Sequence, residues 1–167
     1  MTRSGPNRLL SLLLLSAAAC HGISVDATHA PDVDFSKLRT FSWLEVTPGS
    51  GTHVSDEAIL ELVADELTAK GLQRDTASPD LLVAVHRSIE GSLNTKKSGY
   101  EFRDGRLQRY DLQQGSLVVD LITTNDREGV WRGAAHGAFR FDASPEERLQ
   151  MLASVLHDMF ADFPPGR

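Results

Sequence analysis

The sequence has a single cysteine, Cys20, and no hydrophobic run long enough to cross a membrane. A lone cysteine forms no disulfide within its own chain, so a folded domain here depends on its hydrophobic core for stability. The longest apolar stretch, residues 9–15, is interrupted by Ser11, whereas a membrane-spanning helix needs about 20 apolar residues. These two shortages exclude a disulfide-stabilised scaffold and a transmembrane helix.

Signatures of catalysis are also missing. The chain contains neither the G-x-S-x-G elbow of the α/β-hydrolases nor the G-x-x-x-x-G-K-[ST] phosphate loop. None of the six histidines has the short spacing, as in H-x-H or H-E-x-x-H, with which one element grips a metal ion. We therefore expect a protein that is not an enzyme and uses no cofactor.

Basic residues are fewer than acidic ones. The 17 Lys and Arg against 23 Asp and Glu give a formal charge of −6, and loss of Arg3 and Arg8 with a leader would make the charge −8. Phosphate binding needs clustered Lys and Arg. An acidic chain of this kind is a poor ligand for nucleic acid.

The first residues have the parts of a bacterial export signal. Arg3 and Arg8 precede the leucine-rich stretch, and the small residues at 16–19 lead directly to Cys20. This order predicts a lipoprotein signal peptide over residues 1–19 and a mature chain that begins with a lipid-modified Cys20. One position departs from the usual lipoprotein box, which has Leu three residues before the cysteine where this chain has Ala17.

The alternative is an ordinary secretory leader cut after Ala19, which would release the protein with Cys20 as a free thiol. Lipidation is favoured because it explains an exported cysteine that has no partner, and its acyl chains suffice for stable anchoring. His21, in place of the Asp that retains enterobacterial lipoproteins at the inner membrane, favours the outer membrane. We expect a cell-envelope protein that is anchored by lipid and faces the periplasm.

The mature chain has the length of one domain with one core. We expect a lipidated N-terminus and tether with a short strand over residues 20–34, and a single domain over residues 35–167. Alternation of apolar and polar residues, with glycines and prolines between the runs, predicts strands at 23–27, 34–43, 81–89, 116–124 and 130–141. A mobile hairpin is expected within 91–114, with arms at 100–102 and 107–112. Helices are expected at 55–70 and from Ser144 to the prolines at 164–165.

These elements predict an α+β fold: a single mixed, mostly antiparallel sheet with two main helices packed on one face. The helix at 55–70 joins two strands, which is typical of a parallel crossover. Apolar residues on both faces of strand 81–89 favour a central position in the sheet. Trp43 and Trp131 alternate with polar neighbours, so we expect both rings in the core.

The order of these pieces resembles a family of bacterial lipoproteins known only as domain of unknown function 4136. The matching motifs are DFSKLRTFSW at 34–43, KGL at 70–72, SPDLLV at 78–83, GSLVVDL at 115–121, VWRGAA at 130–135 and FPP at 163–165. Leu72 stands where the family commonly has an aromatic residue, and Pro79 where it has an acidic residue or alanine. The resemblance implies an α+β domain on a lipid anchor and no established activity.

Four polar residues on three predicted strands could share the sheet face opposite the helices: His86, Asp120, Arg132 and His136. Two imidazoles and a carboxylate would suit a weak metal site or acid-base chemistry. The simpler interpretation is a solvated sheet face, because a register slip of one residue would disperse the group. His157-Asp158 is likewise expected to be a solvated pair, since adjacent helical residues do not face each other.

Two further segments have a distinctive composition. Small residues at 133–138 indicate that another element approaches strand 130–141 closely, and we expect a helix there in preference to a groove for a ligand or a partner's strand. Five basic residues between 96 and 109 could touch anionic headgroups or glycans, although three interspersed acids favour a solvated hairpin.

Three hypotheses for function follow. The leading one is a non-enzymatic accessory or structural lipoprotein that binds an envelope protein or polymer. The second is a metal-dependent envelope enzyme or binding protein that uses His86, Asp120 and His136. The third is a carrier with an apolar pocket for a small ligand between sheet and helices.

Overall fold

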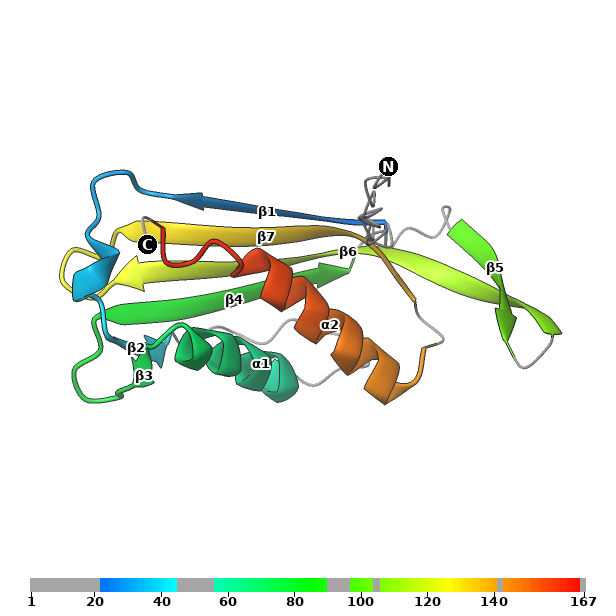
Figure 1. Cartoon of the computed structure of the whole chain (residues 1–167), viewed down its shortest axis with the longest axis horizontal. Coiled ribbons are helices and arrows are strands. Elements are labelled where there is room, and N and C mark those ends of the chain that lie inside the picture. The colour runs from blue at the N-terminus through cyan, green and yellow to red at the C-terminus, as the bar shows by residue number, and fades with distance from the viewer. Residues whose placement is uncertain (1–21, 45–55, 90–96, 104–105, 141–142, 166–167) are drawn as a thin grey trace, which may run out of the picture.

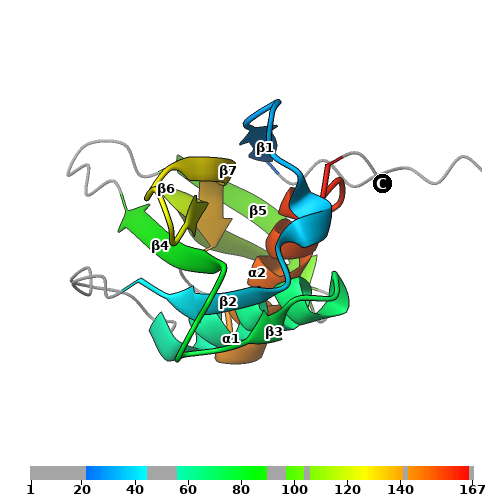
Figure 2. The ribbon, with the colours of Figure 1, turned by 90° about the vertical axis from the view of Figure 1, so that its left-hand side faces the viewer.

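The computed structural model describes residues 22–44, 56–89, 97–103, 106–140 and 143–165. Within these ranges seven strands form one sheet, and two helices lie on one of its faces (Figures 1 and 2). The strands are β1 (Ile23–His29), β2 (Thr40–Trp43), β3 (Gln73–Arg74), β4 (Leu81–Ile89), β5 (Lys97–Arg103), β6 (Arg106–Thr123) and β7 (Gly129–Arg140). The helices are α1 (Asp56–Ala69) and α2 (Pro145–Met159). The predicted α+β class is confirmed.

The sheet is mixed and mostly antiparallel, in the order β1-β7-β6-β4-β2-β3, with β5 paired to the outer part of β6. Only β2 runs parallel to its neighbours β3 and β4. The other pairs, β1–β7, β7–β6, β6–β4 and β5–β6, are antiparallel. The parallel pairing of β2 and β4 around α1, and the central place of β4, agree with the sequence-based predictions.

Helix α1 is amphipathic and ends at a glycine. Its apolar residues at three- and four-residue spacing, Ile59, Val63 and Leu67, are buried against the sheet. Gly71 adopts φ +93°, and the Leu72 and Gly71 amides donate to the carbonyls of Leu67 and Thr68, the pair of bonds that closes a helix in a Schellman motif. The predicted helix stop is therefore confirmed.

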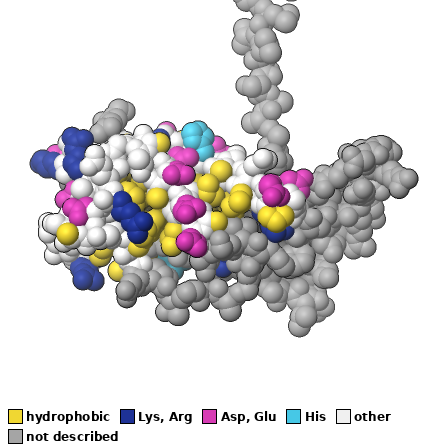
Figure 3. Space-filling view, turned by 90° about the horizontal axis from the view of Figure 1, so that it is seen from below, with side chains coloured by type: hydrophobic (Ala, Val, Ile, Leu, Met, Phe, Trp, Pro, Cys, Tyr) yellow, Lys and Arg dark blue, Asp and Glu magenta, His cyan; other side chains and the backbone are white. Residues whose placement is uncertain are grey.

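The opposite side of α1 is acidic. Glu57, Glu61 and Asp65 follow each other at four-residue spacing and are all exposed. Figure 3 shows the molecule from below, with acidic side chains gathered in the middle of this side. This side of the domain therefore presents negative charge to its surroundings.

Helix α2 begins as the sequence indicates. Ser144 and Glu147 form a reciprocal capping box, and Pro145 occupies the first turn. Leu152, Val155, Leu156 and Met159 are buried. Leu149, expected in the apolar face, is instead 36% exposed, because it lies in the first turns of the helix, before the buried stretch begins.

Three strands, β1, β2 and β6, have limits that differ from the predicted ones. Residues 34–43 are a strand only from Thr40, because Asp34 caps a 3-10 turn at Phe35–Lys37. The predicted segments 107–112 and 116–124 are one continuous strand, β6, since β7 pairs with the residues between them, Gln113 to Gly115. Strand β1 begins at Ile23 as predicted, continues two residues beyond the predicted end to His29, and pairs with β7 throughout.

Most of the core lies between the sheet and the two helices. Phe41, Leu81 and Val119 are fully buried, and Trp131 is 4% exposed, as predicted. Trp43 is only half-buried, although it packs edge-on against Phe41 with ring centroids 5.8 Å apart.

Several sequence-based predictions lie outside the described residues: the signal peptide at 1–19, Cys20, His53 and the loop at 48–51. Among the residues that the structure describes, no helix is long and apolar enough to span a membrane.

Candidate functional site

The four polar residues predicted to share the open sheet face do lie on it, but they do not form one group. Asp120 and Arg132 are register partners on β6 and β7. The Arg132 Nε and Nη2 atoms donate to the Oδ1 and Oδ2 atoms of Asp120 at 2.5 and 2.9 Å. This carboxylate raises the pKa of Arg132, first through the hydrogen bond and then through its charge. Both Asp120 oxygens are therefore occupied by one guanidinium.

His86 and His136 lie on either side of β6. His86 is the register partner of Val118, and His136 is the partner of Ser116. Strand β6 therefore separates the two histidines, and their register positions along it differ by two residues. Both side chains are exposed. In the described part of the chain, no three His, Cys, Asp or Glu residues are grouped to hold a metal ion. The fold therefore does not bring His86, Asp120 and His136 together as the metal-site hypothesis requires.

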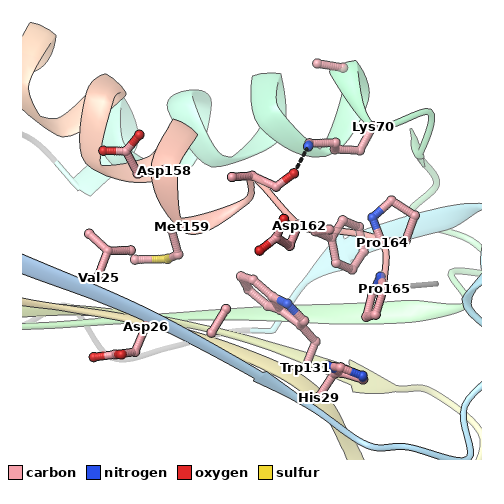
Figure 4. Close-up of a pocket in the computed structure, with 14 residues that line it drawn as sticks. Val25, Asp26, His29, Lys70, Trp131, Asp158, Met159, Asp162, Pro164 and Pro165 are labelled. Atoms are coloured by element: carbon pink, nitrogen blue, oxygen red, sulfur yellow. Dashed lines mark hydrogen bonds between the residues drawn. The ribbon is translucent and has the colours of Figure 1, made fainter. Parts of the chain in front are cut away.

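A pocket with a volume of about 740 Å³ opens on the other face of the sheet, beside β1 (Figure 4). Four segments that are distant in sequence enclose it: β1, the end of α1, β7 through Trp131, and the end of α2 with the residues that follow. Its apolar lining includes Val25, Ala27, Trp131, Met159, Phe163, Pro164 and Pro165.

The aromatic wall of the pocket is packed on several sides. Trp131 stacks on Phe160 with centroids 4.7 Å apart and meets Phe163 edge-on at 5.5 Å. Phe163 also meets Phe35 edge-on at 5.8 Å, and Phe35 meets His29 at 6.3 Å. Such contacts each add to the area that the rings bury, so the wall is a rigid part of the core.

Charged groups surround this apolar wall. Asp158 and Asp162 contribute carboxylates to the lining, and Lys70 contributes one ammonium group. The Lys70 Nζ donates to the Ala161 carbonyl at 3.1 Å, which ties the end of α1 to the turn after α2 (Figure 4). The pocket therefore suits a ligand with an apolar body and a cationic or hydrogen-bond-donating group.

The predicted solvated pair His157-Asp158 is divided between two environments. The His157 Nδ1 lies 3.4 Å from the Glu66 Oε1 of α1, whereas Asp158 lines the pocket. The residues that line the pocket could not be predicted from the sequence, because only the fold brings β1 next to residues 158–165.

The small residues on β7 make room for this chain's own elements. A Cβ added to Gly133 would meet Met159 of α2 and lie 2.5 Å from the Trp131 Cη2. A Cβ added to Gly137 would lie 2.5 Å from the Gly22 carbonyl oxygen at the start of β1. The expectation that a helix crosses these residues is confirmed, and β1 of the same chain fills the edge beside them.

Known proteins share this fold. The chain covers 37% of a PDZ domain protein from Parabacteroides distasonis, with 18% identity, 87% of this chain aligned and a TM-score of 0.55. It covers 95% of PelC from Paraburkholderia phytofirmans, solved as a dodecamer, with 12% identity, 83% of this chain aligned and a TM-score of 0.53. The chain thus spans about a third of the first of these proteins and nearly the whole of the second.

No curated protein matches the sequence. A family profile does match, over residues 25–165, which include all the described strands and helices apart from the first two residues of β1. This match covers far more than half of the chain, and the motifs at 34–43, 78–83 and 130–135 lie within it. The chain belongs to the family described as Domain of unknown function (DUF4136).

Proposed function

We propose that this protein is a lipid-anchored domain of the bacterial cell envelope that acts by binding a partner and not by catalysis. The observation that carries the proposal is the start of β1 at Ile23, only three residues after Cys20. Three residues span at most about 10 Å. A lipid on Cys20 would therefore hold the sheet directly against the membrane surface.

The pocket beside β1 is the binding site that we favour for a small ligand. It lies along the strand that would carry the anchor, and Trp131, Met159 and Phe163 give it an apolar wall next to carboxylates. This supports the carrier hypothesis as a second candidate function. The metal-dependent hypothesis has less support, because the two Asp120 oxygens already accept from Arg132.

Fractionation of cells tests the anchor. Cys20→Ser should move the domain from the membrane pellet to the soluble periplasmic fraction, since lipid on this residue is the proposed attachment. Ala17→Leu is the matched control, because it restores the usual lipoprotein box and should leave the protein in the membrane. A Cys20→Ser protein that stays in a salt-washed pellet contradicts the proposal.

Site-specific crosslinking tests the pocket. A photoreactive residue placed at Ala27 would line the pocket, whereas one at the next position, Thr28, would lie on the opposite face of β1. In intact cells, we expect the residue 27 variant to gain a small-molecule adduct that mass spectrometry detects and the residue 28 variant lacks. Equal labelling of both variants would count against the carrier function.

A further inference from the structure

The β5–β6 hairpin extends from the end of the sheet at which β1 begins. Ile23 is the register partner of Gly137, and Gly137 is the partner of Gly115 on β6. From Gly115 the strand continues outward to Arg106, nine residues further, which is about 30 Å at the usual rise of a strand. Figure 1 shows the hairpin reaching past the helices on the side where β1 starts.

The arms of this hairpin are basic in an acidic protein. Residues 97–103 and 106–112 contain four basic residues, Lys97, Arg103, Arg106 and Arg109, against the two acids Glu101 and Asp111. The chain as a whole has a formal charge of −6. Exposed Glu57, Glu61 and Asp65 make the helical side of the domain acidic (Figure 3). The arms of the hairpin therefore carry a net positive charge in a chain that is acidic overall.

The strand register pairs two basic residues with each other. Phe102 and Leu107 are partners near the end of the hairpin, and the next pair outward is Arg103 with Arg106. Two like charges directly opposite each other destabilise a strand pair, and an anion bound beside them would relieve this repulsion.

We propose that the β5–β6 hairpin is a membrane-contact element that lies on anionic phospholipid headgroups beside the anchor. The inference rests on the proposed lipid at Cys20, which fixes the end of the sheet that faces the bilayer. Aromatic residues and Lys or Arg together are typical of the membrane interface. Charged residues along the hairpin keep it at headgroup depth, because burying them in hydrocarbon is unfavourable.

Vesicle binding by the unlipidated protein tests this contact. We would use the mature chain with Cys20→Ser, so that the result does not depend on the lipid, and vesicles of phosphatidylcholine with or without phosphatidylglycerol. We expect binding only to the anionic vesicles and release at high salt, since screening weakens contacts between exposed charges. A protein that ignores both kinds of vesicle at low salt overturns the inference, even where fractionation supports the anchor.

Charge reversal locates the contact. Arg103→Glu with Arg106→Glu should lower binding to anionic vesicles at least tenfold, on the order expected when several charges near a membrane change sign. The variant keeps a like-charged pair at the tip, so the repulsion between the arms is unchanged. Arg74→Glu with Arg127→Glu is the matched control, because β3 and the β6–β7 turn lie at the opposite end of the sheet. Equal losses in both variants would mean that net charge alone drives binding.

A fluorescent probe gives a second measurement, which does not depend on the folding of the charge variants. Cys20 is the only cysteine, so the Cys20→Ser chain accepts one label at Gln108→Cys on the hairpin or at Arg127→Cys at the far end. An emission shift with anionic vesicles should appear for the hairpin label and not for the other. A shift at position 127 alone would overturn the inference. So would hairpin crosslinks to an envelope protein without any response to vesicles, since these would assign the hairpin to a protein partner.

Discussion

Arg132 on β7 lies directly opposite Asp120 on β6 and donates two hydrogen bonds to its carboxylate. The two side chains differ in exposure: 63% of the Arg132 side chain is accessible to solvent, but only 12% of that of Asp120. The arginine therefore covers a carboxylate that has little contact with water. This arrangement gives Asp120 a structural role.

Loss of the arginine should destabilise the domain more than its exposure suggests. We expect Arg132→Met to lower the free energy of unfolding by about 1–3 kcal/mol, because the poorly solvated Asp120 would lose its partner. Arg132→Met with Asp120→Leu should recover much of the loss, since no buried charge remains. Denaturant unfolding measures both. A single variant as stable as wild type would show that water satisfies Asp120.

The sequence predicted those features of the fold that depend on local signals. Gly71 marked the end of α1, and Ser144 with Glu147 marked the start of α2, because helix caps need only neighbouring residues. It did not reveal the full length of β6. Gln113 and Gln114 read as a break between strands, and only pairing with β7 keeps this part of the strand extended.

The candidate sites were harder to predict for the same reason. Alternation correctly assigned His86 and His136 to one face, but strand order and register decided that β6 separates them. The pocket depends on contacts among β1, Lys70 and residues 158–165. No local pattern encodes contacts between segments so distant in sequence.

The close packing of α2 on β7 predicts that Gly133 tolerates no larger residue. Gly133→Ala should lower stability by about 1–3 kcal/mol, because the added methyl group would force Met159 and the Trp131 ring to move. Gly129→Ala is the control, since nothing lies within 4 Å of its new Cβ. Thermal melting would distinguish the two, and equal melting temperatures would mean that α2 shifts freely.

The Trp131 ring is central to the pocket wall and to the core. We expect Trp131→Ala to reduce the free energy of unfolding by about 3–5 kcal/mol, the usual effect of removing a buried aromatic ring. Trp43→Ala should have a smaller effect, because Trp43 is only half-buried. Chemical denaturation tests both variants. A loss under about 1 kcal/mol for Trp131→Ala would contradict its structural role.

Zinc should not stabilise the protein. His86 and His136 are on strands separated by β6, and Arg132 engages Asp120. An ion that bound only the folded state would add about 2.7 kcal/mol at a hundred times its dissociation constant. We therefore expect no shift of several degrees in melting temperature on addition of zinc. A shift that disappears in His86→Ala or His136→Ala would restore the metal-dependent hypothesis.

Asp80 should make the stability of the domain depend on pH. Its Oδ2 accepts from the Arg39 amide at 2.8 Å and from the Thr40 amide and hydroxyl at 3.0 Å, which joins the starts of β2 and β4. The bond from the Arg39 amide, followed by those from Thr40, lowers the pKa of Asp80 below its ordinary value of 3.8, against the opposing effect of burial.

Because the pKa is lower in the folded state, the carboxylate stabilises the fold at pH values above 3.8, and this contribution disappears as the pH falls through the folded-state pKa. Asp80→Asn should therefore be less stable than wild type at neutral pH, by about 1 kcal/mol for a partly exposed group. The difference should vanish in strong acid, where wild type is protonated as well.

Asp75→Asn is a useful comparison, because Asp75 caps only its own turn through the Ala77 and Ser78 amides. Melting curves of wild type and both variants at several pH values test the prediction, and a constant gap between wild type and Asp80→Asn at every pH would show that shape, and not charge, links the two strands.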